Sequence, residues 1–167
     1  LYLNKYHPIA IVEAKDNKHS ISHGLQQAKE YAEMMDVPFA YSSNGDGFQE
    51  YDFLTGAERT LPMDGFPTVD ALVARYKAER NDGQGLNAEE EKLIAQPFYS
   101  SQTTYPPRYY QRNAVNRTLD AIARGQDRIL LVMATGTGKT YTAFQIVYRL
   151  LSSGVKRKVL YLADRNN

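Results

Sequence analysis

The chain contains no cysteine, which excludes disulfide bonds and thiolate metal sites and fits a reducing cytoplasm. It also lacks an apolar run long enough to cross a membrane, so no membrane partner is expected. The sequence shows no internal repeats and no low-complexity tracts. Its 167 residues, of which 43% are hydrophobic and 23% charged, have the composition of a globular protein and allow one ordinary domain or two small ones.

A strong excess of one charge is also lacking, since the formal net charge is +1. The charges are nevertheless unevenly distributed. Residues 1–100 hold 9 Lys and Arg against 16 Asp and Glu, a balance of −7, whereas residues 101–167 hold 11 against 3, a balance of +8. This asymmetry predicts two units with different tasks, the second suited to polyanions, although a solvated basic surface on an ordinary fold would give the same counts.

A phosphate-binding loop is predicted directly after the apolar run 129–132. Strand, glycine-rich turn and helix follow one another there, and such a turn offers backbone N–H groups and a helix dipole to polyphosphate. Lys139 is expected to reach the β and γ phosphates of ATP, and the Thr140 hydroxyl to bind Mg²⁺. The residues expected to contact the nucleotide are Thr135, Gly136, Thr137, Gly138, Lys139 and Thr140. Met133 replaces the first glycine of the general pattern, as is common in superfamily-two helicases and translocases.

The context of this loop argues against a merely flexible glycine turn. The next helix should bury an apolar face, and Val159–Leu162 has the pattern of the following buried strand. That face comprises Ala143, Phe144, Val147, Leu150 and Leu151. Gln111 lies 28 residues before Lys139, which is similar to the place where superfamily-two motors have a glutamine that reads adenine through its amide. The resemblance implies that Gln111 reads adenine and that Tyr105 or Tyr109 stacks on the base. The alternative for Gln111 is a solvent-facing position at the start of a helix.

A second candidate site lies near the start of the chain. An apolar strand, Pro8–Val12, leads into Glu13 and Lys15, which the two-residue period of a strand places on one side. A carboxylate and an ammonium presented together can bind Mg²⁺ and position an attacking water. Gln27 and Tyr31 are spaced to share one face of the following helix. The alternatives are an ordinary ion pair at a strand end and a polar helix face with one packed tyrosine.

Periodicity and turn residues predict the remaining elements. Helices are expected at residues 21–35, 69–78, 88–94 and 109–124, with Thr68 and Asn87 as caps of the second and third. Strands are expected at residues 1–3, 37–43 and 48–53, the last two joined by a tight turn at 44–47. The middle of the chain is expected to be connective, with a linker at Asn81–Gly85 and an extended segment at 97–107.

The ordered combination of Glu13, Lys15, Gln27 and Tyr31 resembles the PD-(D/E)xK nucleases that carry an added Q-x-x-x-Y motif. The resemblance implies that Glu13 ligates a metal ion and that Lys15 activates or orients the hydrolytic water. It further implies that Gln27 and Tyr31 support the site or contact the DNA backbone. The family also has an acidic metal ligand on the preceding strand. Residues 1–12 contain no acidic residue, so that ligand is expected upstream of Leu1.

Four blocks together resemble the restriction (motor) subunit of Type I restriction-modification enzymes. They are Pro8–Lys15, Arg108–Arg112, Met133–Thr140 and Leu160–Arg165, the last being the start of a helicase motif that touches the DNA backbone. The resemblance implies ATP-driven translocation of double-stranded DNA and Mg²⁺-dependent cutting in the prokaryotic cytoplasm. It also implies modification (methyltransferase) and specificity subunits as partners, with S-adenosylmethionine bound only by the methyltransferase.

The expected class is therefore α/β, a partial PD-(D/E)xK fold with a mixed sheet joined to the first part of a RecA-like P-loop domain with a parallel sheet. The expected parts are the nuclease at residues 1–60, a helical connector at 61–104 and the ATPase start at 105–167. The chain is expected to be a fragment that is inactive alone. Two alternatives stay open: another ATP-dependent helicase-nuclease of repair or defence, and a degenerate nuclease fold that only docks DNA or partner subunits.

Overall fold

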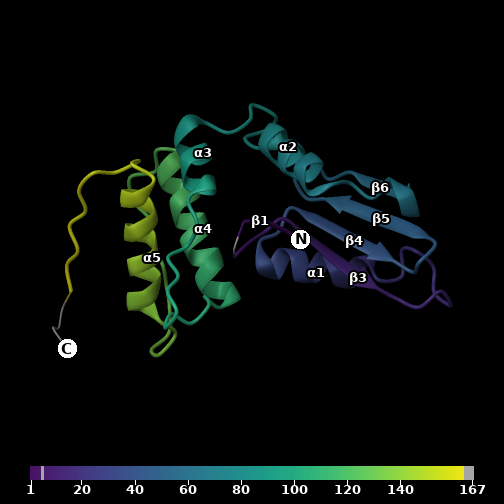
Figure 1. Ribbon diagram of the computed structural model, residues 1–167, viewed down its shortest axis with the longest axis horizontal. Coiled ribbons are helices and arrows are strands. Elements are labelled where there is room, and N and C mark those ends of the chain that lie inside the picture. Colours follow the sequence, from purple (N-terminus) through teal and green to yellow (C-terminus); the bar gives the residue numbers. More distant parts are fainter. Residues whose placement is uncertain (5, 164–167) are drawn as a thin grey trace. The chain divides into compact units, whose positions relative to one another are not determined.

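The computed structural model describes residues 1–4 and 6–163. The chain divides into two compact units, Leu1–Leu86 and Asn87–Asn167, and each is described by itself (Figure 1). The boundary comes directly after the glycine-containing turn at Asn81–Gly85, where Asn81, Asp82, Gly83 and Gly85 all have positive φ. The finer borders at residues 60 and 104 stay a prediction.

The first unit is built on a mixed four-stranded sheet in the order β3-β4-β5-β6. Its strands are β3 (Ala10–Ala14), β4 (Phe39–Ser43), β5 (Gly47–Asp52) and β6 (Glu58–Pro62). β3 and β4 are parallel and joined through helix α1 (Leu25–Met35), whereas the other neighbours are antiparallel. A small antiparallel pair, β1 (Tyr2–Asn4) and β2 (His7–Pro8), precedes β3. A 3-10 turn, Met63–Gly65, follows β6.

Helices cover both faces of this sheet. On one face, α1 packs Ala28 and Ala32 against Val37 and Ala40. On the other face, helix α2 (Val69–Glu79) buries Leu72 and Tyr76. The Thr68 hydroxyl accepts a hydrogen bond from the N–H of Ala71, as expected of an N-cap. Because successive side chains of a strand point to opposite faces of the sheet, α1 and α2 pack against different residues of the same strands.

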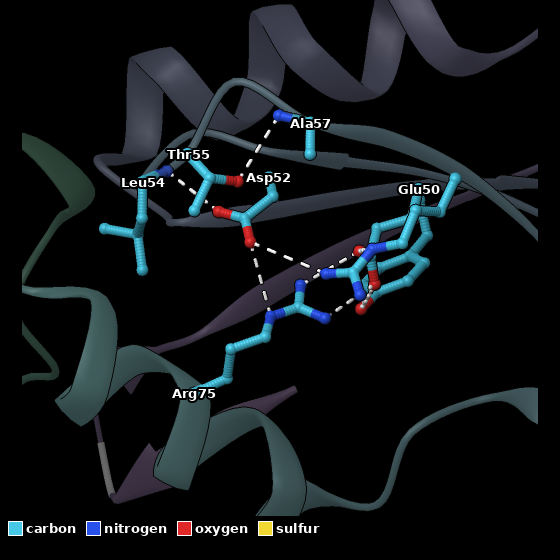
Figure 2. A network of polar contacts seen from close by, with 8 residues as sticks. Glu50, Asp52, Leu54, Thr55, Ala57 and Arg75 are labelled. Carbon is cyan, nitrogen blue, oxygen red and sulfur yellow. Dashed lines mark hydrogen bonds and ion pairs between the residues drawn. The ribbon is translucent and has the colours of Figure 1, made fainter. Parts of the chain in front are cut away.

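Two buried carboxylates stand on the α2 face of the sheet (Figure 2). Glu50 and Asp52 are 1% and 0% exposed. Arg75 of α2 approaches both, with Nη2 at 3.0 Å from Glu50 Oε1 and Nε at 3.3 Å from Asp52 Oδ2. Arg59 of β6 places Nε 3.0 Å from Glu50 Oε1. The Tyr41 hydroxyl donates to Glu50 Oε2 at 2.5 Å, and its burial, together with the Glu50 carboxylate, raises the pKa of Tyr41.

The second unit consists of helices α3 (Ala88–Ala95), α4 (Tyr109–Ala123) and α5 (Lys139–Ser152). The Asn87 side chain accepts from the N–H groups of Glu89 and Glu90, and the Glu90 carboxylate accepts from the Asn87 N–H, which completes a capping box. Within the described ranges, no helix is both long and apolar enough to reach across a bilayer.

The buried side of α5 is polar. Gln145 is fully buried and holds both backbone atoms of Tyr99, accepting from its N–H at 2.9 Å and donating to its carbonyl at 3.1 Å. Arg149 donates to the side chain of Asn116 and to the carbonyl of Leu93. Burial lowers the pKa of Arg149 to about 10, so the guanidinium remains charged at neutral pH. These contacts hold α5 to α4, to α3 and to the segment after α3.

Two expectations for this unit are wrong in the described residues. The segments 129–132 and 159–162 form no strands, and Leu130, Val132, Leu160 and Leu162 are 81–88% exposed. A strand requires a partner for its N–H and C=O groups, and no described segment supplies one. For the same reason the expected apolar face of α5 is partly open, with Phe144 at 47% and Leu151 at 42% exposure.

Two further differences concern the first unit. No strand was expected at Glu58–Pro62, where the structure has β6, an exposed polar strand that pairs with β5 and shows no apolar alternation in the sequence. Helix α1 starts at Leu25 instead of residue 21 because the preceding residues close turns of their own. Two of these turns are closed by hydrogen bonds: the His23 N–H donates to the Ser20 carbonyl, and the Leu25 N–H donates to the Ser22 carbonyl.

Candidate functional site

The pair Glu13 and Lys15 lies on one side of the chain at the end of β3. Lys15 Nζ donates to Glu13 Oε1 at 2.8 Å. The side chains are 21% and 25% exposed, so both can be reached from solvent. Parallel pairing with β4 carries on past the pair, because Lys15 N–H donates to the carbonyl of Ser43 at 2.8 Å. The backbone at the pair is therefore held by the sheet.

Helix α1 adds the other two predicted residues. Lys15 Nζ also donates to Gln27 Oε1 at 2.8 Å, and Gln27 Nε2 donates to the Tyr31 hydroxyl at 3.1 Å. Glu13, Lys15, Gln27 and Tyr31 thus form one line of hydrogen bonds that joins β3 to one face of α1. Because Gln27 turns its acceptor to Lys15 and its donor to Tyr31, the ammonium is fixed between an amide oxygen and a carboxylate.

The metal-binding capacity of this place is partial. Among residues 1–4 and 6–163, no group of three or more His, Cys, Asp or Glu side chains could hold a metal ion. Glu13 supplies one carboxylate group. Mg²⁺ in proteins is typically held by one or two carboxylates together with waters and substrate phosphates. The donor chemistry fits Mg²⁺, with Glu13 as one ligand.

The predicted phosphate loop opens α5. Gly138 precedes the helix at φ +86°, and Gly136 has φ +78°, both in the left-handed region that favours glycine. Lys139 Nζ lies 3.4 Å from the Met133 carbonyl and 3.3 Å from the Ala134 carbonyl. The Thr137 hydroxyl donates to the Ala134 carbonyl at 2.6 Å. The loop is thus closed by its own hydrogen bonds.

The side of the loop that would meet a ligand is open. Thr135, Gly136, Lys139 and Thr140 are exposed. The Thr140 hydroxyl stands in the first turn of α5, beside the lysine that precedes it. A polyanion approaching the start of α5 would meet an ammonium, a hydroxyl and free backbone donors together.

Gln111 is buried at 9% exposure, so its alternative as a solvent-facing residue is wrong. Its Nε2 donates to the Thr137 carbonyl at 2.9 Å, and its Oε1 accepts from the Arg108 N–H at 2.9 Å. The amide therefore links the start of α4 to the phosphate loop. Tyr105 and Tyr109 are 89% and 42% exposed.

Sequence reasoning missed Tyr110. This ring lines a pocket beside the phosphate loop together with Ala114 of α4 and five residues of the chain that leads into the loop. Those five are Leu131, Val132, Met133, Ala134 and Thr137. In the last block of the sequence, residues 160–163 form no helix or strand, whereas Asp164 and Arg165 lie outside the described residues.

Comparison with known proteins gives matches to restriction enzymes. The sequence profile of the family described as "Type III restriction enzyme, res subunit" matches residues 104–167. The endonuclease subunit of the Type I restriction enzyme EcoAI from Escherichia coli is 45% identical over 163 residues, which are 95% of this chain and 20% of that subunit. The endonuclease subunit of EcoKI from Escherichia coli strain K12 is 50% identical over 60 residues, 36% of this chain and 5% of that subunit.

A solved structure gives the same result. A fragment assigned as an HsdR subunit of a type I restriction enzyme from Vibrio vulnificus YJ016 matches with a TM-score of 0.78 at 40% identity, covering 91% of this chain and 27% of that chain. The expected α/β class, a mixed sheet with flanking helices, is confirmed. The chain spans about a fifth of the length of the EcoAI subunit. On these likenesses in sequence and fold, the chain is homologous over 95% of its length to the endonuclease (HsdR) subunits of Type I restriction enzymes.

Proposed function

We propose that this chain is the part of an ATP-dependent DNA-translocating endonuclease where the nuclease and the motor meet. The full-length subunit cuts double-stranded DNA with Mg²⁺ after ATP-driven translocation, in the prokaryotic cytoplasm. Its partners are the modification and specificity subunits, and S-adenosylmethionine belongs to the methyltransferase. The observation that carries this proposal is the line of hydrogen bonds from Glu13 through Lys15 and Gln27 to Tyr31.

In the nuclease, Glu13 holds Mg²⁺ and Lys15 orients the water that attacks a phosphodiester. Gln27 fixes the lysine, and Tyr31, at 41% exposure, is accessible to the DNA backbone. The bound metal ion supplies charge stabilisation for the phosphodiester and lowers the pKa of the attacking water. The ammonium that already lies between two oxygen acceptors is suited to hold such a water in line.

A second acidic ligand is proposed on the strand before β1. Leu1 pairs with the start of β3, since its N–H group donates to the Ala10 carbonyl and its carbonyl accepts from the Ile9 N–H, both at 2.9 Å. Residues that precede Leu1 in a longer protein would continue antiparallel beside β3 toward Glu13. A carboxylate there would complete the metal site.

In the motor, Lys139 neutralises the β and γ phosphates and Thr140 binds the Mg²⁺ of ATP, while Gly136 and Gly138 let the backbone approach. Gln111 reads the adenine from its place beside Thr137. The stacking aromatic is Tyr105 or Tyr109, and the pocket lining adds Tyr110 as a third candidate. In phosphoryl transfer of this kind, positioning and charge stabilisation are the main contributions of the protein.

The test uses the full-length subunit assembled with its methyltransferase. Lys139→Ala should lower ATP hydrolysis and DNA cleavage together, by about 100-fold or more, because a preorganised cation at the phosphates is lost. Lys15→Ala should lower cleavage by about 100-fold and leave ATP hydrolysis unchanged. The matched control is Lys18→Ala, in the exposed loop after β3, which should change neither rate. Normal cleavage by the Lys15 variant would overturn the nuclease assignment.

One observation favours a second candidate. The described residues contain no group of three or more His, Cys, Asp or Glu side chains that could hold a metal ion, as expected of a degenerate nuclease fold that only docks DNA or partner subunits. In that case Lys15→Ala would leave cleavage intact but weaken DNA binding or subunit assembly. Measuring cleavage and assembly on the same variant separates the two candidates.

A further inference from the structure

We infer that Gly24 and Ser42 are positioning residues of the nuclease site, which set how closely the start of α1 lies over Glu13 and Lys15. The inference rests on the proposed nuclease function and adds to it two residues that the sequence motifs do not contain. Neither residue has chemistry of its own to offer the reaction. Their part is to hold the line of hydrogen bonds in register.

The first observation is a contact between the start of α1 and β4. Gly24 directly precedes α1, and its N–H donates to Ser42 Oγ at 3.1 Å in a buried hydrogen bond. Ser42 is 0% exposed and stands opposite Glu13 in the register of β3 and β4. The helix start is thus tied to the residue beside the proposed metal ligand.

The second observation is the lack of space at Gly24. Its backbone has φ −87° and ψ −4°, which every residue type adopts, so glycine is not needed there for its conformational freedom. A Cβ at this position would instead lie 2.9 Å from Ser42 Oγ, 3.0 Å from Glu13 Cγ and 3.3 Å from Lys15 Cε. The three nearest atoms belong to the two proposed active-site residues and to the serine that anchors the helix. Glycine is needed because the backbone itself lies against the pair.

The third step leads from this contact to the reacting groups. Gln27 follows Gly24 within the first turn of α1, and its Oε1 accepts from Lys15 Nζ at 2.8 Å. A hydrogen bond of this type weakens once the distance between donor and acceptor exceeds about 3.2 Å. A shift of the helix start away from the sheet would therefore weaken the bond between Gln27 and Lys15, and a new methyl group would push the side chains of Lys15 and Glu13 aside. Both effects displace the same ammonium.

The test compares Gly24→Ala with the unchanged full-length subunit in its assembly. DNA cleavage should fall by about 10-fold to 100-fold, the effect typical of a misplacement near 1 Å, with ATP hydrolysis unchanged. A second readout needs neither metal nor turnover: acetylation of Lys15 by acetic anhydride, measured by mass spectrometry relative to the exposed Lys18. Lys15 donates to two partners in the unchanged chain, so its relative labelling should rise severalfold in the variant.

Ser42→Ala provides an independent variant that adds no bulk. It leaves the Gly24 N–H without its acceptor and should produce a smaller change in the same direction for both readouts. Since Ser42 Oγ is the nearest atom to the added methyl, Gly24→Ala should cost less in the Ser42→Ala background than alone, a coupling expected only of residues in contact. Ser22→Ala, at an exposed serine of the same loop, is the control and should change neither readout.

The outcomes separate the possibilities. Normal cleavage and unchanged labelling in Gly24→Ala would overturn the inference. A loss of cleavage with unchanged relative labelling of Lys15 would also overturn it, because Gly24 would then affect packing without positioning the lysine. If Lys15→Ala cuts normally, the proposed function fails, yet the labelling ratio still decides whether Gly24 and Ser42 position the lysine.

Discussion

At the scale of single residues, the first unit contains buried carboxylates that are paired with arginine side chains. Glu50 and Asp52 are removed from water on the α2 face of the sheet, where isolated carboxylates would be strongly unfavourable. Arg75 reaches both of them (Figure 2), and its guanidinium carbon also lies 4.2 Å from the centre of the Phe39 ring. The pairing of these groups compensates for desolvation, so the loss of one partner should cost more than its contacts suggest.

Arg75→Ala should therefore destabilise the sheet of the first unit by about 3 kcal/mol, because two buried carboxylates lose their common cation. Hydrogen exchange of the β4 and β5 amides measures the local opening free energy. Arg59→Ala is the matched control, since Arg59 pairs with the same carboxylates but is 48% exposed, and it should cost about 1 kcal/mol. Equal effects of the two substitutions would contradict this account.

Local spacing predicted the relative positions of part of the proposed nuclease site. The two-residue period of a strand placed Glu13 beside Lys15, and the helical spacing of Gln27 and Tyr31 placed them on one face, as the structure has them. The contact between Gly24 and Ser42 joins residues 18 apart in sequence, and no local pattern reports it. Gly24 has an ordinary φ, and the sequence does not indicate that a glycine is needed there because a side chain would not fit.

At the scale of helices and strands, predictions held where the cause is local. Thr68 and Asn87 cap their helices as expected because a side-chain acceptor next to free N–H groups needs no distant partner. Strands are different, since their hydrogen bonds depend on which neighbour the fold brings alongside. The sequence therefore gives no sign of β6, which is polar, whereas the apolar segments 129–132 and 159–162 predict strands that the described residues do not form.

These two segments should become strands in a longer chain. Their exposed side chains and open backbone groups are suited to a buried sheet. Hydrogen exchange of residues 129–132 should therefore be fast in the chain of 167 residues and strongly protected in the full-length subunit. The amides of α4 serve as the reference, because their helix is formed in the chain as described. Fast exchange of residues 129–132 in both proteins would contradict the RecA-like assignment.

At the scale of the whole chain, the two candidate sites belong to different units, the nuclease residues to Leu1–Leu86 and the nucleotide residues to Asn87–Asn167. Each unit is formed around its own elements and keeps its own buried polar contacts. The chemistry of either site can therefore be lost without the other, which is the basis for separating the lysine variants by their effects on ATP hydrolysis.

The chain of 167 residues alone should not cut DNA. Its described residues hold no group of three or more His, Cys, Asp or Glu side chains that could bind a metal ion, and affinity for Mg²⁺ decreases when charged ligands are missing. Incubation of supercoiled plasmid with the chain and Mg²⁺ should give no linear product, whereas the full-length assembly with ATP should. Cutting by the chain that disappears in Lys15→Ala would show instead that Glu13 suffices as the protein's carboxylate ligand.

The hydrogen bonds between α5 and Tyr99 affect how α5 can move. One glutamine in the middle of the helix holds a backbone N–H and a carbonyl at once, while the arginine one turn later is fastened to α4 through Asn116. A rotation of α5 about its first turn would therefore also move Tyr99 and α4. Because Gln111 lies on α4 and Lys139 on α5, the residues proposed to read the base and the phosphates would then move together.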